Sequence, residues 1–150
     1  MRVVVQRVSE ASVEIGGMIK GRIGRGLLVL VGIEDCDTTE DAEWLCGKIA
    51  RLRIFDDAGG VMNLAVTDAG GEALVISQFT LHASTKKGNR PSYIRAARPE
   101  KAIPLYDHFL HILQGYLETP VQRGEFGAYM QVKLINDGPV TIVIDSRNKE

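Results

Sequence analysis

The sequence predicts an α+β fold in which an antiparallel or mixed, barrel-like β-sheet carries two main helices. Segments with the two-residue periodicity of strands outnumber segments with helical periodicity. The strand segments also follow one another in series, whereas a doubly wound sheet would alternate them with helices. The length of 150 residues and the apolar content of 45% suit one core. We therefore expect a single domain over residues 1–150.

The first third of the chain is predicted to be a series of strands. Arg2 to Val8 alternates and is rich in valine. Ala11 to Ile15 and Met18 to Ile23 flank Gly16-Gly17, a two-residue hairpin signal. The continuous apolar run from Leu27 to Ile33 predicts a strand that is buried on both faces.

A first helix is expected after the third of these strands. Asp37 can cap it, Glu40 follows three residues later, and the pattern fades near Arg53. Residues at positions i, i+3, i+4 and i+7 form one apolar face, made of Ala42, Leu45, Cys46 and Ile49.

A second helix is expected from Pro99 to about Leu117, since proline suits the first helical turn. Its predicted inner face consists of Ile103, Tyr106, Leu110 and Leu113. Pro104 lies inside this pattern and predicts a bend or a later start, because proline lacks the backbone N–H.

The remaining strands are predicted from apolar runs between turn signals. Glu72 to Leu81 is the longest of them, with alternating faces up to its end. Three strands then close the chain: Val121 to Phe126, Tyr129 to Ile135 and Val140 to Asp145. Asn136-Asp137-Gly138-Pro139 is predicted to be a turn between the last two.

Several functional classes find no support in the sequence. No apolar run approaches the roughly 20 residues of a membrane helix, and the first residues lack the pattern of a signal peptide, so we expect a cytoplasmic protein without membrane contact. Gly21 to Gly26 has the reverse of the dinucleotide-binding spacing, and no cofactor is predicted. His108 and His111 lack a third ligand at suitable spacing, so no metal is predicted. The two cysteines, Cys36 and Cys46, are expected to be free buried thiols.

The net charge of −1 conceals a basic segment. Between Lys86 and Lys101 there is one acid, Glu100, and six bases: Lys86, Lys87, Arg90, Arg95, Arg98 and Lys101. A local positive patch attracts phosphate whatever the net charge. The segment is either a phosphate-binding loop or a solvated loop that carries charge for solubility.

Two further segments carry polar or rigid groups where a core strand ends. Ser77, Gln78 and Thr80 end a strongly apolar strand, which would suit a polar pocket at the sheet edge as well as an ordinary surface. Gly138-Pro139 suits either a plain turn or a rigid, kinked backbone with two fixed carbonyls.

At these two segments the chain resembles the D-aminoacyl-tRNA deacylase family. The family signatures S-Q-F-T and N-x-G-P-x-T correspond to 77–80 and 136–141. The likeness extends to QRVSEASVEI, GLLVLVGI, RIFDDAGGVMNL and GNRPSY, and so covers nearly the whole chain. The resemblance implies a homodimer that hydrolyses the ester between a D-amino acid, or glycine, and the terminal ribose of tRNA.

The resemblance also implies roles for individual residues. Gly138 and Pro139, joined by a cis bond, would enter the pocket of the partner subunit and exclude L-amino acids, and Arg7 would support them. Ser77, Gln78 and Thr80 would form the pocket floor, with Phe79 as a substrate-binding residue and Ala102 as a small lining residue. Lys86, Lys87 and Arg90 would contact phosphates of the acceptor end.

The chemistry and the activity itself stay open at this point. Thr80 is either a nucleophile or a positioning residue that acts while the 2′-hydroxyl of the terminal ribose assists; we favour the second, because no histidine has a spacing that fixes it as a base. The alternatives to a D-specific enzyme are a non-catalytic tRNA- or amino-acid-binding module and a relative with relaxed chirality. A thiol hydrolase is disfavoured, because Cys36 lies among acids.

Overall fold

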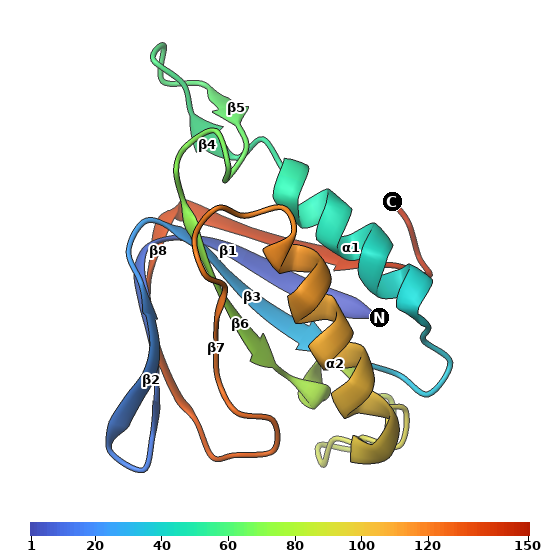
Figure 1. Ribbon diagram of the computed structural model, residues 1–150. Helices are drawn as coiled ribbons and strands as arrows, with labels where there is room; N and C mark the ends of the chain where they lie inside the picture. The colour runs from blue at the N-terminus through green and yellow to red at the C-terminus, as the bar shows by residue number, and fades with distance from the viewer.

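The computed structural model describes residues 1–150, and its centre is a curled, mixed six-stranded sheet in the order β2-β1-β3-β6-β7, with β8 paired to the free side of β1 (Figure 1). A separate two-stranded hairpin, β4-β5, projects from one end. This confirms the predicted α+β class with two helices. The elements are β1 (Arg2–Ile15), β2 (Met18–Ile23), β3 (Gly26–Gly32), α1 (Thr39–Arg51), β4 (Phe55–Asp56), β5 (Met62–Leu64), β6 (Glu72–Ser77), the 3-10 turn η1 (Phe79–His82), α2 (Pro99–Gln114), β7 (Gln122–Arg123) and β8 (Gln131–Asp145).

Strand β1 is the spine of the sheet. Its first half pairs with β3, its second half pairs with β2, and β8 runs antiparallel along its other side. The two strands predicted over 2–8 and 11–15 are therefore one, because β8 supplies hydrogen-bonding partners along nearly the whole length. Strands β3 and β6 are parallel, and the short β7 extends the parallel part.

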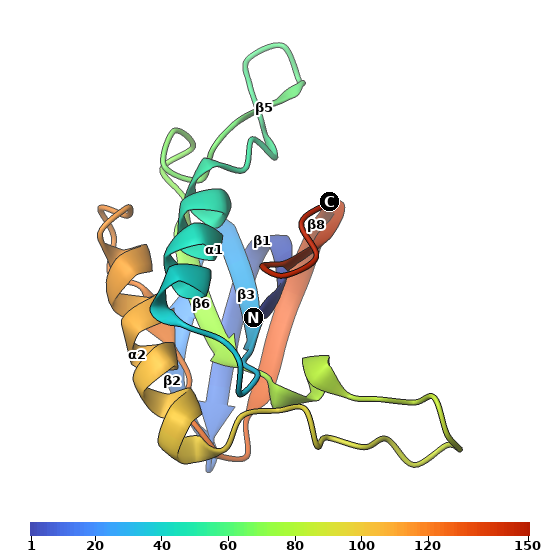
Figure 2. The same cartoon turned by 90° about the vertical axis from the view of Figure 1, so that its right-hand side faces the viewer.

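Both helices cover one face of the sheet, as the side view shows (Figure 2). Between helices and sheet lies a core of 23 buried residues that includes the predicted α1 face. A second cluster of seven, among them Val8, Leu28 and Ile76, fills the inside of the curl. The run from Leu27 to Ile33 contributes to both clusters, which confirms the prediction that this strand is buried on both faces. No helix is both long and apolar enough to cross a membrane.

The helix starts differ from the predictions. Thr38, not Asp37, caps α1, and its backbone N–H donates to the Asp41 carboxylate at 2.8 Å. Asp37 is 1% exposed and instead accepts from the ammonium group of Met1 at 2.5 Å. A carboxylate with a buried cation beside it is more strongly held than one at a solvated helix end.

Pro104 neither delays nor ends α2, which begins at Pro99 as its first residue. Proline at this sixth position removes one early backbone bond, and its exposed side leaves room for the ring. The helix faces the core with Ala102, which is 3% exposed, whereas Ile103 is 40% exposed, so its assignment to the inner face was wrong. The helix ends at Gln114, three residues before the expected Leu117.

Candidate active site

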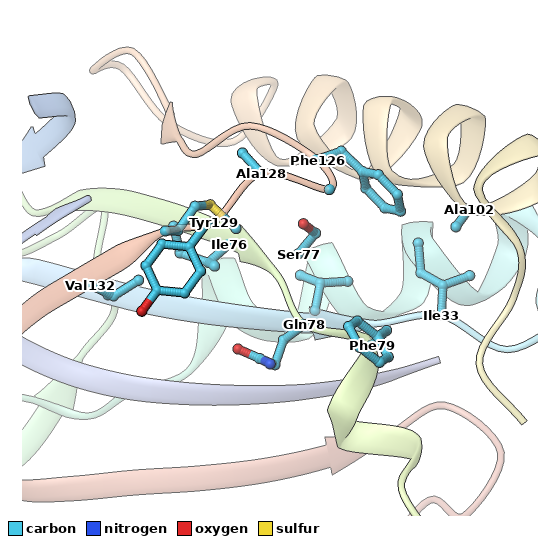
Figure 3. Close-up of a pocket in the computed structure, with 13 residues that line it drawn as sticks. Ile33, Ile76, Ser77, Gln78, Phe79, Ala102, Phe126, Ala128, Tyr129 and Val132 are labelled. Carbon is cyan, nitrogen blue, oxygen red and sulfur yellow. The ribbon is translucent and has the colours of Figure 1, made fainter. Parts of the chain in front are cut away.

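A cavity of about 270 Å³ opens at the end of β6 (Figure 3). Ten of its 13 lining residues are hydrophobic. Ser77 and Gln78 are the polar side chains that reach it, from the strand end, and Ala102 closes it from α2. A polar pocket was predicted at this edge. A cavity does lie there, but it is mostly apolar, with two polar side chains at one wall.

The strand that carries these residues ends earlier than expected. Strand β6 stops at Ser77, the backbone N–H of Gln78 donates to the Val31 carbonyl at 2.7 Å, and the chain then turns into η1. The turn packs on Gly32, where an added Cβ would lie 2.9 Å from that of Leu81. The predicted alternation of faces beyond Ser77 was therefore wrong, because the chain leaves the sheet there.

Because the chain leaves the sheet after Ser77, Thr80 lies outside the cavity. Ser77, Gln78 and Phe79 line the cavity, and Thr80 does not. The Gln78 amide donates to the Thr80 hydroxyl at 2.6 Å and so links the two. Since an amide is a donor here and removes no proton, this contact orients the hydroxyl without activating it as a nucleophile.

The opposite wall was missed by sequence reasoning. It comes from the irregular segment after β7 and the start of β8, with Phe126, Tyr129, Met130 and Val132. Phe126 also packs against Tyr106 at a ring-centroid distance of 6.0 Å. The strands predicted over Val121 to Phe126 and Tyr129 to Ile135 were wrong here, because β7 covers only Gln122–Arg123 and β8 begins at Gln131. The irregular chain between them forms this wall.

His82 is the nearest histidine along the chain to Thr80, and it faces away from the cavity. It is 1% exposed, and its Nδ1 lies 3.3 Å from the Glu34 carboxylate. The same Glu34 oxygen lies 2.6 Å from the guanidinium of Arg95. Glu34 thus joins the end of β3, the turn η1 and the segment that follows the basic loop. We conclude that His82 holds the turn in place and is not a base for Thr80.

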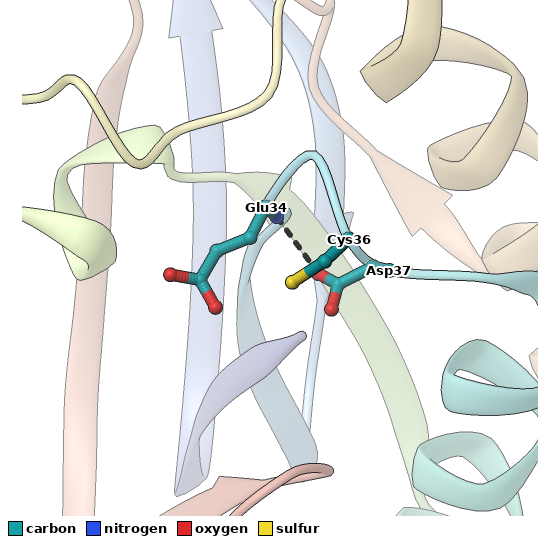
Figure 4. A group of neighbouring side chains, drawn as sticks. All are labelled: Glu34, Cys36 and Asp37. Carbon is teal, nitrogen blue, oxygen red and sulfur yellow. Dashed lines mark hydrogen bonds between the residues drawn. The ribbon is translucent and has the colours of Figure 1, made fainter.

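The acidic side chains near α1 are already neutralised by the chain itself. Glu34, Cys36 and Asp37 bring their ligand atoms within 4.8 Å of one another (Figure 4). Asp37 binds the Met1 ammonium group and lies 3.3 Å from Arg147, while Glu34 binds Arg95. Both carboxylates of this group are thus paired with cations of the same chain.

Neither thiol suits nucleophilic chemistry. Burial raises the pKa of the Cys46 thiol to about 12, and its sulfur donates to the Phe109 carbonyl. Cys36 is exposed, which contradicts the expectation that both cysteines are buried, and it lies outside the cavity. A thiolate is the reactive form, so the thiol-hydrolase alternative has no candidate at the cavity.

The Gly138-Pro139 segment is a bulge and not the predicted turn between two strands. Strand β8 continues through it, with Asn136 opposite Val8 and Thr141 opposite Gln6. Four residues of β8 therefore stand opposite Arg7 alone, and the excess is displaced from the ladder. The peptide bond between Gly138 and Pro139 is cis, as the resemblance implied, and both residues are exposed.

The other residues of the N-x-G-P-x-T motif close this bulge. The Asn136 amide donates to the carbonyls of Arg7 and Val140 at 3.0 and 2.9 Å. The Thr141 hydroxyl donates to the Asn136 side-chain oxygen at 3.4 Å. The motif therefore encodes a closed backbone loop that presents its central residues to solvent.

Arg7 supports the bulge from beneath. Its guanidinium is 8% exposed and donates to the carbonyls of Ile54 and Asp137 at 2.7 and 3.1 Å. The carboxylates of Asp56 and Asp137 lie 3.5 and 3.4 Å away. A buried cation with these acceptors fixes where the bulge sits.

The basic loop, between η1 and α2, projects from the body of the protein (Figure 2). Ser84 and Ser92 pair across its base with backbone bonds of 2.8 and 2.9 Å. Lys86, Lys87 and Arg90 lie beyond this pair, all exposed, and none belongs to an ion pair. Unpaired cations on a projecting loop are available to an anionic partner.

The whole fold recurs in solved structures. One, described as "c-Myc DNA Unwinding Element Binding Protein", shares 44% identity and a TM-score of 0.92 over 97% of this chain and 98% of its own. Another, described as a probable eukaryotic D-amino acid tRNA deacylase, shares the fold at 18% identity, with a TM-score of 0.80 over 95% and 97% of the two chains. Both solved structures therefore share the fold of this chain over nearly its whole length.

Sequence relatives define the family more closely. Proteins named D-aminoacyl-tRNA deacylase from Parabacteroides distasonis, Akkermansia muciniphila and Bacteroides thetaiotaomicron are 64%, 63% and 62% identical to the chain, each over 100% of both sequences. The sequence model described as D-Tyr-tRNA(Tyr) deacylase matches residues 4–145. The chain belongs to the D-Tyr-tRNA(Tyr) deacylase family.

Proposed function

We propose that the protein is an ester hydrolase that removes D-amino acids from tRNA. The observation that carries this proposal is the polar pair Ser77 and Gln78 at the wall of an otherwise apolar cavity, in a chain of this family. Water adds to the carbonyl carbon of the ester, the bond to the ribose oxygen breaks, and a free D-amino acid and uncharged tRNA leave. Glycine, which has no side chain, is a second substrate. The reaction belongs in the cytoplasm, where charged tRNA is used.

Catalysis in this proposal depends on position and not on a protein nucleophile. Ser77 and Gln78 bind the carbonyl and amino groups of the substrate and stabilise the developing oxyanion. Gln78 is fixed in turn by its bond to the Thr80 hydroxyl. No histidine or carboxylate touches that hydroxyl, so the 2′-hydroxyl of the terminal ribose is the better candidate to assist proton transfer.

Discrimination against L-amino acids requires a second copy of the chain. In one chain Gly138 and Pro139 are exposed and line no part of its own cavity. In the homodimer that we propose, Gly138 and Pro139 of the partner subunit enter this cavity and occupy the space that an L side chain needs. Backbone carbonyls exclude without selecting any side chain, which suits an enzyme for many D-amino acids.

The basic loop supplies affinity for the acceptor end of tRNA. Lys86, Lys87 and Arg90 would contact phosphates, which adds binding energy with little sequence preference. Their joint replacement by alanine should raise KM for charged tRNA about tenfold and flatten its dependence on salt. Replacement of Lys20, Lys133 and Lys149 is the matched control. An unchanged dependence of KM on salt would mean that the loop does not contact tRNA.

The first test compares hydrolysis of tRNA charged with D-tyrosine and with L-tyrosine at catalytic enzyme concentration. Loss of the D form with the L form spared is the expected result. Loss of neither ester would favour a non-catalytic binding module. Loss of both would favour a relative with relaxed chirality, in which the bulge does not exclude L substrates.

A further inference from the structure

The most exposed aromatic side chain of the protein stands at the mouth of the cavity. Tyr129 is 85% exposed, compared with 55% for Phe79 and 41% for Tyr93. It belongs to neither of the two aromatic pairs, whereas Tyr106 is buried and donates its hydroxyl to the Val75 carbonyl. Single exposed apolar side chains are common, but this one also lines the cavity.

The backbone holds this ring outward. The neighbouring Met130 packs inward against the second core cluster, and its sulfur leaves no room for a side chain at Gly124. Tyr129 borders the cavity as well, but its side chain lies in solvent. A turn closed by the Ala128 N–H to the Glu125 carbonyl at 3.2 Å, with Gly127 at φ +77°, fixes the segment before it.

The ring lies at the opposite end of the cavity from Ala102, with Ser77 between them (Figure 3). If the ester of the terminal nucleotide lies at Ser77, the nucleotide that precedes it can therefore reach Tyr129. The acceptor end of tRNA is single-stranded, so its bases expose their faces. Exposed aromatic side chains are a usual means of binding such bases, because every base has a face that can stack.

We propose that Tyr129 stacks on the unpaired base that precedes the terminal nucleotide of the charged tRNA. The inference rests on the proposed deacylase function and adds the part of the substrate that this surface binds. Tyr129 is a binding residue: it contacts no reacting atom, and it selects polynucleotide esters over simple ones.

The test compares three D-tyrosyl esters: of adenosine, of a dinucleotide ending in adenosine, and of full-length tRNA. Relative to the adenosine ester, Tyr129→Ala should raise the KM for the dinucleotide and tRNA esters about tenfold. Tyr129→Phe should behave like the original protein, since stacking needs the ring and not the hydroxyl. Tyr116→Ala, which removes a 40% exposed tyrosine outside the cavity, is the matched control.

Other outcomes would overturn the stacking contact. Equal KM for Tyr129→Ala and the original protein on all three esters would exclude it. An equal rise in KM for the adenosine ester would mean that Tyr129 contacts the terminal nucleotide or the amino acid and not the preceding base, and a Phe variant as impaired as the Ala variant would assign the effect to the hydroxyl. If the original protein hydrolyses none of the esters, the deacylase function fails and not the stacking inference alone.

Discussion

The two family motifs lie in opposite environments. The S-Q-F-T segment ends a core strand, and its first three side chains line a cavity of their own chain. The N-D-G-P-V-T segment is a bulge whose central residues are exposed and line no cavity of their own chain. The backbone of the first is bonded to β3 through the Gln78 N–H and the Val31 carbonyl, and the second is held by the guanidinium of Arg7.

This difference suggests how one small domain can combine hydrolysis with exclusion. A cavity wall must be buried to bind the ester, whereas an excluding group that acts in another subunit must project and stay rigid. Four predictions test whether the two segments differ in this way, and they are arranged from the largest expected effect to the smallest.

Replacing Arg7 with Met should cost about 3 kcal/mol of stability, because two buried carbonyls, of Ile54 and Asp137, lose a charged donor. Unfolding in urea measures the loss. Arg22→Met, at an exposed arginine of β2, is the control and should change little. If Arg7→Met unfolds like the original protein, Arg7 does not fix the bulge.

Replacing Gly138 with Ala should lower the free energy of unfolding by about 2 kcal/mol, because it disturbs the bulge. The residue has φ +127°, and the added Cβ would lie 2.9 Å from the Arg7 guanidinium and from Val140. We expect kcat/KM for L-tyrosyl-tRNA relative to D-tyrosyl-tRNA to rise at least about tenfold. Gly60→Ala has a similar positive φ, +75°, in open space and should leave the ratio unchanged. An unaltered ratio for Gly138→Ala would mean that this segment does not determine the discrimination between D- and L-tyrosyl-tRNA.

The sequence predicted features that depend on local pattern. The doubly buried run from Leu27 to Ile33 and the apolar face of α1 could be read from periodicity and residue type, whereas the two motifs were recognised by their resemblance to the family. These features follow from which side chains must leave water, and neighbouring residues carry that information.

Features that depend on distant partners could not be predicted. Strand β8 continues past Gly138 because β1 offers a ladder on both sides of the bulge, and the chain leaves the sheet at Ser77 because Gly32 lets η1 pack closely. Asp37 is drawn from its helix to the Met1 ammonium group, which lies beside it only in the folded chain. The cavity wall at Phe126 and Tyr129 likewise arises from packing and not from pattern.

The turn η1 can be loosened without touching the cavity. Arg95→Gln removes the ion pair with Glu34 and leaves this carboxylate facing His82 alone. Since the Arg95 side chain is 56% exposed, the expected loss of stability is only about 1 kcal/mol. Arg123→Gln, which removes the exposed pair with Asp107, is the control and should cost less. Equal losses for both variants would mean that Glu34 does not link the turn to the segment after the basic loop.

The smallest effect is expected at the residue whose chemistry was least settled. Thr80→Val keeps the shape of the side chain and removes the hydroxyl that Gln78 binds, so kcat should fall less than about tenfold. Thr85→Val, on the exposed loop, is the control. Complete loss of activity together with an acyl-enzyme trapped on the original protein would restore Thr80 as a nucleophile. A small loss without any acyl-enzyme would leave hydrolysis to positioning and to the ribose hydroxyl. That result would sharpen the contrast between the motifs. The S-Q-F-T motif would bind and orient the ester, whereas the N-D-G-P-V-T motif would exclude esters of L-amino acids.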